Sequence, residues 1–106
     1  MADAVVRLTT PTKLVLRELL ANPEQETYGR ALMDATGLVP GTLYVILKRL
    51  EAHGWLTSRW EDAGAHAHGR PPRHYYRMTA VGVERAREVL DRMQLRDFRG
   101  RGASRP

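Results

Sequence analysis

Cysteine is absent from this chain of 106 residues, which excludes disulfide bonds and thiolate metal sites. No apolar run approaches the roughly 18 residues of a membrane-spanning helix, and the first residues match neither a signal peptide nor a transit peptide. Acidic side chains are few: 12 stand against 17 basic ones, which gives a formal net charge of +5. We therefore expect a soluble cytosolic protein of one domain, with a polyanionic partner and no membrane partner.

The stretch from Leu38 to Gly54 is predicted to form the central helix of this domain, with Pro40 in its first turn. Apolar residues recur there at spacings of three and four, which places them on one buried stripe. They are Leu43, Ile46, Leu47 and Leu50. The outer face instead carries small groups, hydroxyls and cations, namely Gly41, Val45, Lys48 and Ala52, flanked by Thr42, Tyr44 and Arg49. Such a face suits phosphates and base edges, although an ordinary solvated helix face would also fit.

Two shorter helices are predicted before the central one. The first begins at Thr10, whose hydroxyl caps it ahead of Pro11, and it ends before Asn22-Pro23. The second begins near Thr27 and ends at Gly37, because glycine tolerates the left-handed conformation after a helix. A tight connection then leads into the central helix. This arrangement indicates a helix-turn-helix, and a helical hairpin of an unrelated bundle is the alternative.

Two strands are predicted after Gly54, over residues 55–61 and 73–78, because both segments are rich in strand-forming side chains. A hairpin that follows a helix-turn-helix is a wing, and this one is basic. It carries Arg70, Arg73, Arg77, His66, His68 and His74. Its arginines suit a phosphate backbone, whereas a solvated basic loop is the alternative. Two histidines in a loop of small residues make a poor metal site, so no metal is expected.

Thr79 is predicted to cap a final helix from Ala80 to about Asp97. Its apolar stripe consists of Val83, Ala86, Val89, Leu90 and Met93, with Phe98 just beyond. The stripe is wider than one small domain needs, so we expect it to face a partner helix in a twofold dimer or to fold back on the first helix. The chain then divides into an arm (residues 1–9), a winged helix-turn-helix (10–79), a dimerisation helix (80–98) and a disordered basic tail (99–106).

Short motifs follow one another between residues 9 and 90. They are Tyr28-Gly29, Thr36-Gly37-Leu38, Gly41-Thr42-Leu43-Tyr44, Leu47-x-Arg49-Leu50-Glu51, Gly54-Trp55-Leu56 and Tyr75-Tyr76-Arg77-Met78-Thr79-x-x-Gly82. In these motifs the chain resembles the PadR-type winged-helix transcriptional regulators, in the compact subgroup with a short C-terminal helix. The resemblance implies a mainly α fold with a β-hairpin wing, and a homodimer that usually represses transcription from a palindromic operator on double-stranded DNA. It also implies a bacterial cytoplasmic protein, nucleoid-associated when bound, that in some members is released from DNA by a small aromatic ligand.

The candidate site residues combine this resemblance with the outer-face pattern. The predicted DNA contacts are Gly41, Thr42, Tyr44, Val45, Lys48, Arg49, Arg70 and Arg73. Val45 stands where the family usually has proline, and Val39-Pro40 replaces a polar residue that could cap the helix. The candidates for an aromatic effector pocket are Trp55, Trp60 and Tyr76, which otherwise belong to the core.

Two other classes of function, a protein-contact module and an enzyme, explain fewer of these features than a DNA-binding regulator does. A winged helix used for protein contact, without specific DNA binding, would expose the same outer face. An enzyme is not expected, because the chain lacks a cysteine nucleophile, a glycine-rich phosphate loop and a suitably placed pair of carboxylates. The adjacent acids Glu61 and Asp62 are predicted to face solvent. No cofactor is expected.

Overall fold

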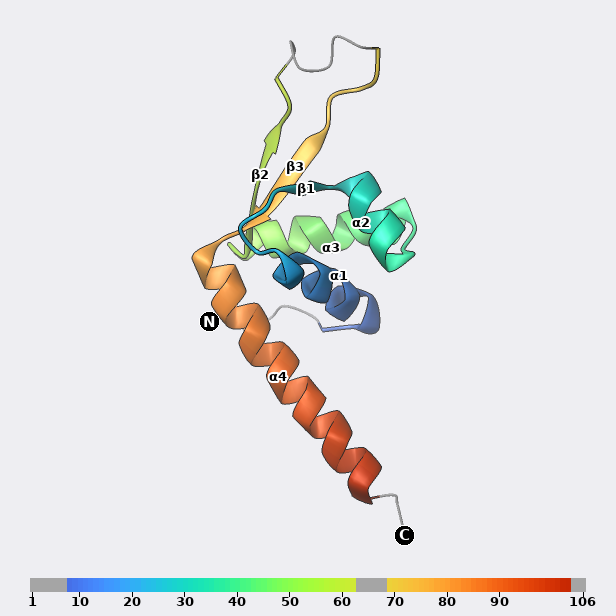
Figure 1. Ribbon diagram of the computed structural model, residues 1–106, viewed down its shortest axis with the longest axis vertical. Coiled ribbons are helices and arrows are strands. Elements are labelled where there is room, and N and C mark those ends of the chain that lie inside the picture. The colour runs from blue at the N-terminus through green and yellow to red at the C-terminus, as the bar shows by residue number, and fades with distance from the viewer. Residues whose placement is uncertain (1–7, 63–68, 104–106) are drawn as a thin grey trace.

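The computed structural model describes the backbone of residues 8–62 and 69–103, with side chains described up to residue 92. The helices and strands of this part are α1 (Thr10–Ala21), β1 (Thr27–Tyr28), α2 (Gly29–Thr36), α3 (Pro40–Ala52), β2 (Leu56–Trp60), β3 (His74–Met78) and α4 (Ala80–Ala103). Helices α1 to α3 form the body, and the β2–β3 hairpin and α4 extend from it in opposite directions (Figure 1). The predicted winged-helix class, mainly α with a β-hairpin wing, is confirmed.

The N-cap of the first helix lies one residue earlier than the sequence predicted. Thr9, in an extended conformation, is the N-cap of α1, and its hydroxyl oxygen accepts a hydrogen bond from the Thr12 amide (3.4 Å). The prediction of Thr10 as the cap was wrong, because Thr10 already has helical geometry and Pro11 follows inside the first turn. Within the predicted arm, residues 1–7 lie outside the described part of the chain.

A short strand replaces the predicted start of the second helix. Thr27 and Tyr28 pair with Tyr76 and Tyr75 of β3, so the antiparallel sheet has the order β1-β3-β2. The predicted helix start at Thr27 was therefore wrong by two residues, because the free edge of β3 offers this segment backbone hydrogen bonds. Helix α2 ends as predicted at Gly37, which has a φ of 77° and donates its N–H to the Met33 carbonyl.

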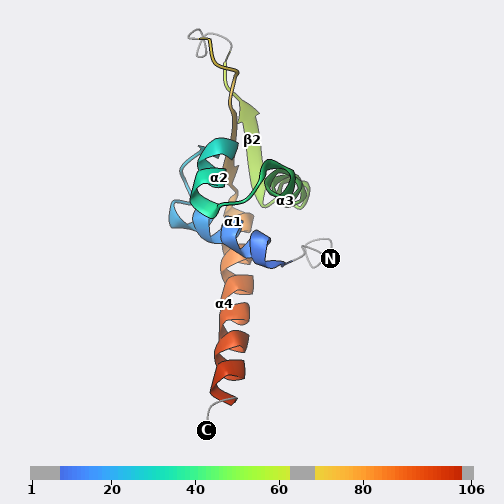
Figure 2. The same ribbon diagram turned by 90° about the vertical axis from the view of Figure 1, so that its right-hand side faces the viewer.

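The core lies where α3 crosses α1 and α2 and packs against the sheet (Figure 2). The predicted stripe of α3 is buried, which confirms the spacing argument. On β3, Tyr76 and Met78 are buried on one face. The core is completed by Val15, Leu16, Leu19, Leu32, Trp55, Leu56 and Ala86. This packing fixes the orientation of α3 and leaves its outer face uncovered by the rest of the described chain.

Helix α4 is capped as predicted and runs further than predicted. The Thr79 hydroxyl oxygen accepts from the Gly82 amide (2.9 Å), while the hydroxyl donates to the Gly54 carbonyl (2.7 Å). The helix reaches Ala103, so the predicted disordered tail is helical over residues 99–103. Glycine weakens a helix by about 1 kcal/mol per residue but does not block its hydrogen bonds, and arginine favours them. Residues 104–106 lie outside the described part.

The first half of α4 packs partly on its own domain. Ala86 is buried, and Val83, Val89 and Leu90 are half-buried against the core. The fold-back on α1 that the sequence left open is thus present, and the half-buried side chains keep some exposed surface. The side chains of Met93 and Phe98 lie outside the described set. Across residues 8–62 and 69–103, no helix is long and apolar enough to cross a membrane.

Candidate nucleic-acid interface

The outer face of α3 is an exposed surface of small, apolar and cationic groups. Val45 is 48% exposed and Tyr44 43% exposed, and Gly41, Lys48 and Arg49 are also exposed. Because the stripe beneath them is buried, α3 cannot turn this face inward without losing the core. The structure thus brings the predicted contact residues of α3 together on one accessible surface.

The acid next to this face is directed away from it. The Glu51 carboxylate accepts a hydrogen bond from the Ser58 hydroxyl of β2, at 2.6 Å. The face formed by Gly41, Val45 and Lys48 therefore presents no carboxylate of its own to an approaching polyanion.

Tyr44 is held by a close contact with the start of α2. Its ring and hydroxyl lie directly over Gly29, so that a Cβ at that position would push the Tyr44 side chain aside. The glycine lets the end of β1 and the start of α2 approach α3 closely. This contact orients the Tyr44 side chain at the border between α3 and the wing.

Glu61 organises the outer end of the β2–β3 pair, next to Trp60. Its two carboxylate oxygens accept hydrogen bonds from the two terminal nitrogens of Arg70, at 2.8 and 2.9 Å. The Arg73 amide and the Tyr75 hydroxyl also donate to it, each at 3.3 Å. The Glu61 side chain is only 9% exposed. The prediction that it faces solvent was wrong, because a pairing nine residues along the chain across an irregular loop leaves no periodic signal in the sequence.

These donors shift the titration of Glu61. The Arg70 hydrogen bonds, aided by the Arg73 amide, lower the pKa of Glu61 to about 2. The same ion pair raises the pKa of Arg70. Both charges are therefore present throughout the range in which the protein would meet DNA, and Arg70 is tied to the outer end of the β2–β3 pair.

This shift predicts a pH dependence of stability. A carboxylate whose folded pKa lies below its unfolded value stabilises the fold above the unfolded pKa, and this stabilisation is lost as pH falls toward the folded pKa. Urea midpoints should therefore fall more steeply between about pH 5 and about pH 2 in the wild type than in Glu61→Gln. Arg70→Met removes the partner and should flatten the curve in the same way. Identical slopes for the three proteins would contradict the assignment.

The outside of the wing is braced by arginine–aromatic contacts. Arg73 lies over the Tyr28 ring, 4.2 Å from its centroid, and Arg59 lies 5.0 Å from that of Tyr75. Arg59 also holds Glu26 through two hydrogen bonds of 2.7 Å. The sequence did not predict this pair, which joins residues 33 positions apart. Arg73 remains half-exposed, and the tip with His66 and His68 lies outside the described residues.

A ladder of stacked rings lines the other side of the wing. Trp60 stacks on His74, with centroids 4.3 Å apart and an interplanar angle of 16°. His74 in turn lies 4.5 Å from the Tyr76 ring and shares a 3.1 Å hydrogen bond with its hydroxyl. Burial raises the pKa of Tyr76. Trp60 is 61% exposed, whereas Trp55 is 1% exposed inside the core.

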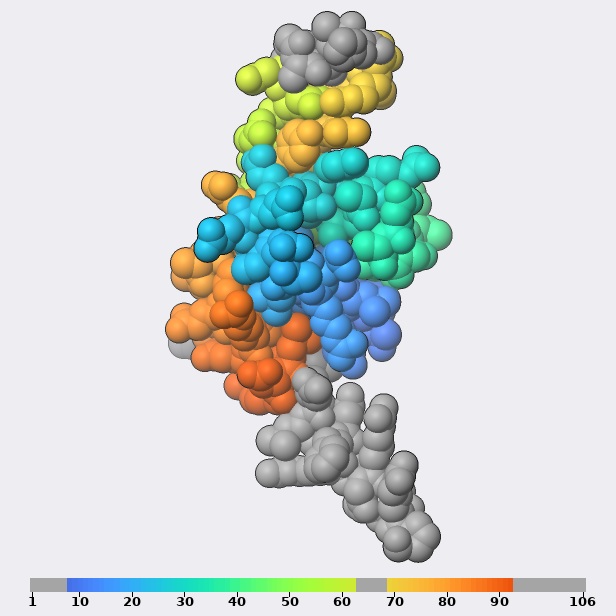
Figure 3. Space-filling view, viewed as in Figure 1, coloured from blue at the N-terminus to red at the C-terminus, as the bar shows by residue number. Residues whose placement is uncertain are grey.

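The ladder borders a hollow of about 730 Å³ between the wing and the start of α2 and α3. We call it the wing hollow. Its lining residues are Tyr28, Gly29, Arg30, Tyr44, Trp60, Arg70, Pro71, Pro72, Arg73, His74 and Tyr76. In Figure 3 the wing is a narrow projection beside the broader surface of α2. Of the three candidates for an aromatic pocket, Trp60 and Tyr76 line this hollow, while Trp55 belongs to the core.

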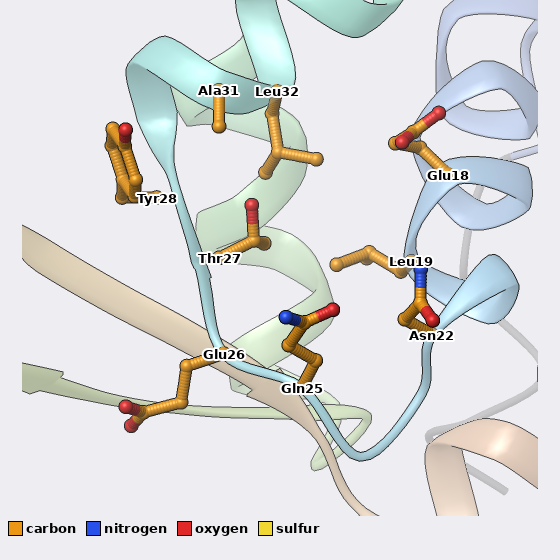
Figure 4. Close-up of a pocket in the computed structure, with 9 residues that line it drawn as sticks. All are labelled: Glu18, Leu19, Asn22, Gln25, Glu26, Thr27, Tyr28, Ala31 and Leu32. Atoms are coloured by element: carbon orange, nitrogen blue, oxygen red, sulfur yellow. The ribbon is translucent and has the colours of Figure 1, made fainter.

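A second hollow, of about 230 Å³, lies between α1, β1 and α2 (Figure 4). Glu18 and Glu26 are on its rim, but they come from opposite sides, and Glu26 is bound to Arg59. In the parts of the chain where side chains are described, no group of three or more histidines and acids is placed to hold a metal ion. The candidate binding surfaces are therefore the outer face of α3 and the wing hollow.

Comparison with known proteins finds a matching family and several similar structures. The family described as "Transcriptional regulator PadR-like family" matches residues 18–88. A PadR family transcriptional regulator from Eggerthella lenta DSM 2243 is 31% identical, with a TM-score of 0.68 over 89% of this chain and 84% of that chain. The PcaV transcriptional regulator from Streptomyces coelicolor is 26% identical, with a TM-score of 0.62 over 81% of this chain and 57% of that chain.

A transcriptional regulator homologue from Pyrococcus horikoshii OT3 shares the fold. It has a TM-score of 0.64 at 22% identity, over 81% of this chain and 79% of that chain. Among curated proteins, no match is found.

Proposed function

The chain belongs to the PadR-like family of transcriptional regulators, and from this premise we propose that it is a dimeric, sequence-specific repressor that reads a palindromic operator through α3. The observation that carries the proposal is the outer face of α3, which is exposed, locally free of acids and fixed in orientation by the buried stripe beneath it. A face of this kind can enter a major groove without placing a carboxylate against phosphate. We propose no catalytic role.

We assign the contacts of α3 by the chemistry of each side chain. Gly41 allows close backbone approach, Thr42 and Tyr44 donate hydroxyl hydrogen bonds to phosphates, and Arg49 adds charge. Lys48 and Val45 reach base edges, where valine suits the methyl group of thymine. In the first turn of α3, Pro40 has no N–H, and the Thr42 and Leu43 amides donate to the Val39 carbonyl (3.1 and 3.0 Å). We therefore propose that the Gly41 amide is the one that meets a phosphate there.

On the wing, we propose that Arg73 contacts the backbone directly and that Arg70 acts chiefly through its ion pair with Glu61. The Arg73 side chain is half-exposed, with its guanidinium over the Tyr28 ring. The bidentate pair at Arg70 holds the descending strand of the wing at a fixed distance from β2. The two sides of the wing are thereby held together at their outer end where they meet DNA.

Dimerisation is proposed to occur through α4. Val83, Val89 and Leu90 are only half-covered by their own domain, and Met93 continues the same sequence stripe. A second copy of α4 would cover this surface in a twofold arrangement. The two α3 helices would then read half-sites about 34 Å apart or a multiple of that distance.

We also propose, from the resemblance, that a small aromatic ligand releases the protein from DNA. Trp60 and Tyr76 offer rings in one hollow that Tyr44 also borders. A ligand seated there would compete with DNA for Tyr44. As a regulator of transcription, the protein is placed by this proposal in the bacterial cytoplasm, at the nucleoid when bound.

The proposal is tested by fluorescence anisotropy with fragments of the protein's own promoter region, at several salt concentrations and with excess nonspecific competitor. We expect one fragment to bind despite competitor, with two chains per site and a steep salt dependence from counterion release. Binding that competitor removes equally from all fragments would overturn the proposal. It would favour the alternative, a winged helix used for contact with another protein.

A further inference from the structure

The wing hollow contains an exposed tryptophan that the DNA contacts proposed above do not use. Trp60 is 61% exposed although it stacks on His74. Trp60 shares the hollow with the 43% exposed Tyr44 and with His74, and a contiguous group of exposed aromatic side chains marks an interaction site. Because His74 stacks on one face of the Trp60 ring, the rest of the ring is exposed in a fixed orientation and can contact a partner.

The charge of the hollow restricts what that partner can be. Three arginines line it, namely Arg30, Arg70 and Arg73, together with His74, and no acid is among its described lining residues. Arg70 is occupied by Glu61. Arg30 forms only a 3.4 Å pair with Asp34, with both side chains more than 70% exposed. Exposed pairs of this kind contribute little, so Arg30 can turn toward an anion. The half-exposed Arg73 can donate to an anion from its place over the Tyr28 ring.

The position of the hollow identifies the anion. Its walls are Tyr44 of α3 on one side and Trp60 and His74 of the wing on the other, and the two views show α3 and the wing at an angle to one another (Figures 1 and 2). When α3 lies in one groove of DNA and the wing meets the neighbouring groove, the sugar–phosphate strand that separates the two grooves must pass between α3 and the wing, where the hollow lies.

We propose that the wing hollow binds this sugar–phosphate strand, with Trp60 packed against deoxyribose and Arg30 and Arg73 on the flanking phosphates. The inference rests on the proposed function and adds Trp60 and Arg30 to the DNA interface. Deoxyribose offers apolar C–H groups to an aromatic ring, and phosphate and sugar contacts fix the register of a protein without reading sequence. Trp60 therefore contributes affinity, and the α3 face contributes specificity.

Tryptophan fluorescence tests the contact directly, because Trp60 and Trp55 are the two tryptophans of the chain and Trp55 is buried. Adding operator DNA to the wild type should shift and quench the exposed component of the emission. Trp60→Ala should weaken binding about tenfold to operator and to unrelated duplex alike, whereas Trp60→Phe should stay within about threefold of wild type. The Trp55 emission of Trp60→Ala reports whether the variant is folded.

Three further variants complete the design. Arg30→Gln should lower the slope of log affinity against log salt by about one, as expected for one lost phosphate contact. Arg17→Gln removes an exposed arginine of α1 that does not line the hollow, and it should leave the slope unchanged. Val81→Ala is the matched apolar control, since Val81 is exposed on α4.

Failure of the inference and failure of the proposed function give different results. If the wild type binds its operator specifically while Trp60→Ala and Arg30→Gln bind as tightly with the same salt slope, the hollow does not hold DNA and the inference is overturned. If the wild type shows no specific binding to any promoter fragment, the proposed function itself is wrong. A loss confined to operator, with unrelated duplex unaffected, would make Trp60 a base-reading residue and would also overturn the backbone assignment.

Discussion

Gly82→Ala should destabilise the protein by about 3 kcal/mol, near the upper end of the cost of overpacking. Any Cβ at Gly82 would collide with the backbone carbonyl of Trp55. That carbonyl cannot move freely, because it accepts a 3.0 Å hydrogen bond from the Thr79 amide. The Thr79 hydroxyl adds a 2.7 Å bond to the Gly54 carbonyl. A methyl group must therefore displace backbone, which is far costlier than rotating a side chain.

The free energy of unfolding from urea titrations measures this effect, and Gly41→Ala provides a matched control. Both glycines lie in the first turn of a helix, but a Cβ at Gly41 meets no atom within 4 Å. Gly41→Ala should stabilise the fold by about 0.5–1 kcal/mol, because alanine loses less backbone entropy in a helix. If Gly82→Ala unfolds at the wild-type urea concentration, the close packing of α4 on the residue before β2 is refuted.

The same junction carries a consequence for function. Gly82 sets how closely the first turn of α4 approaches the body that holds α3. In the proposed dimer, a displacement of α4 would change the separation of the two α3 helices and so the spacing of half-sites. A Gly82→Ala protein that remains folded should therefore lose affinity for its operator more than for unrelated duplex.

Periodic features of the fold were predictable from the sequence, while pairings without a period were not. The buried stripe of α3 followed from its spacing, and the left-handed Gly37 and the capping Thr79 followed from local chemistry. Strand β1 was missed because two residues are too short for any pattern. The Arg59–Glu26 and Arg70–Glu61 pairs were missed because their partners meet only after the wing has folded.

The candidate site divides in the same way. The α3 residues could be grouped from one helical projection, and the structure places them on one exposed face. Trp55 and Trp60 could not be told apart from the sequence. Trp55 comes just before β2 and is buried in the core, whereas Trp60 is the last residue of β2 and is exposed, because the strand runs away from the core. Arg30 was overlooked because it belongs to another element, and only the tertiary arrangement brings it beside the wing.

Lys48→Ala is expected to weaken operator binding by about 1–3 kcal/mol, or roughly tenfold to a hundredfold, if Lys48 reads a base. Lys48 lies on the exposed face of α3, one turn after Val45 and away from the buried stripe. Truncation should leave the fold intact, because the side chain contributes nothing to the core. Affinity for unrelated duplex should fall much less, since a base contact is made only at the correct sequence.

Arg49→Ala is the matched comparison, because Arg49 is the next residue on the same helix and is also exposed. Because Arg49 lies on the flank of the outer face, we expect it to bind a phosphate group. Its loss should weaken operator and unrelated duplex by similar factors and lower the salt slope by about one. The diagnostic quantity is thus the affinity for operator divided by the affinity for unrelated duplex, measured by anisotropy at one salt concentration. A ratio that falls for Arg49→Ala and is unchanged for Lys48→Ala would exchange the two roles and mean that α3 enters the groove rotated about its axis by about one residue, or 100°.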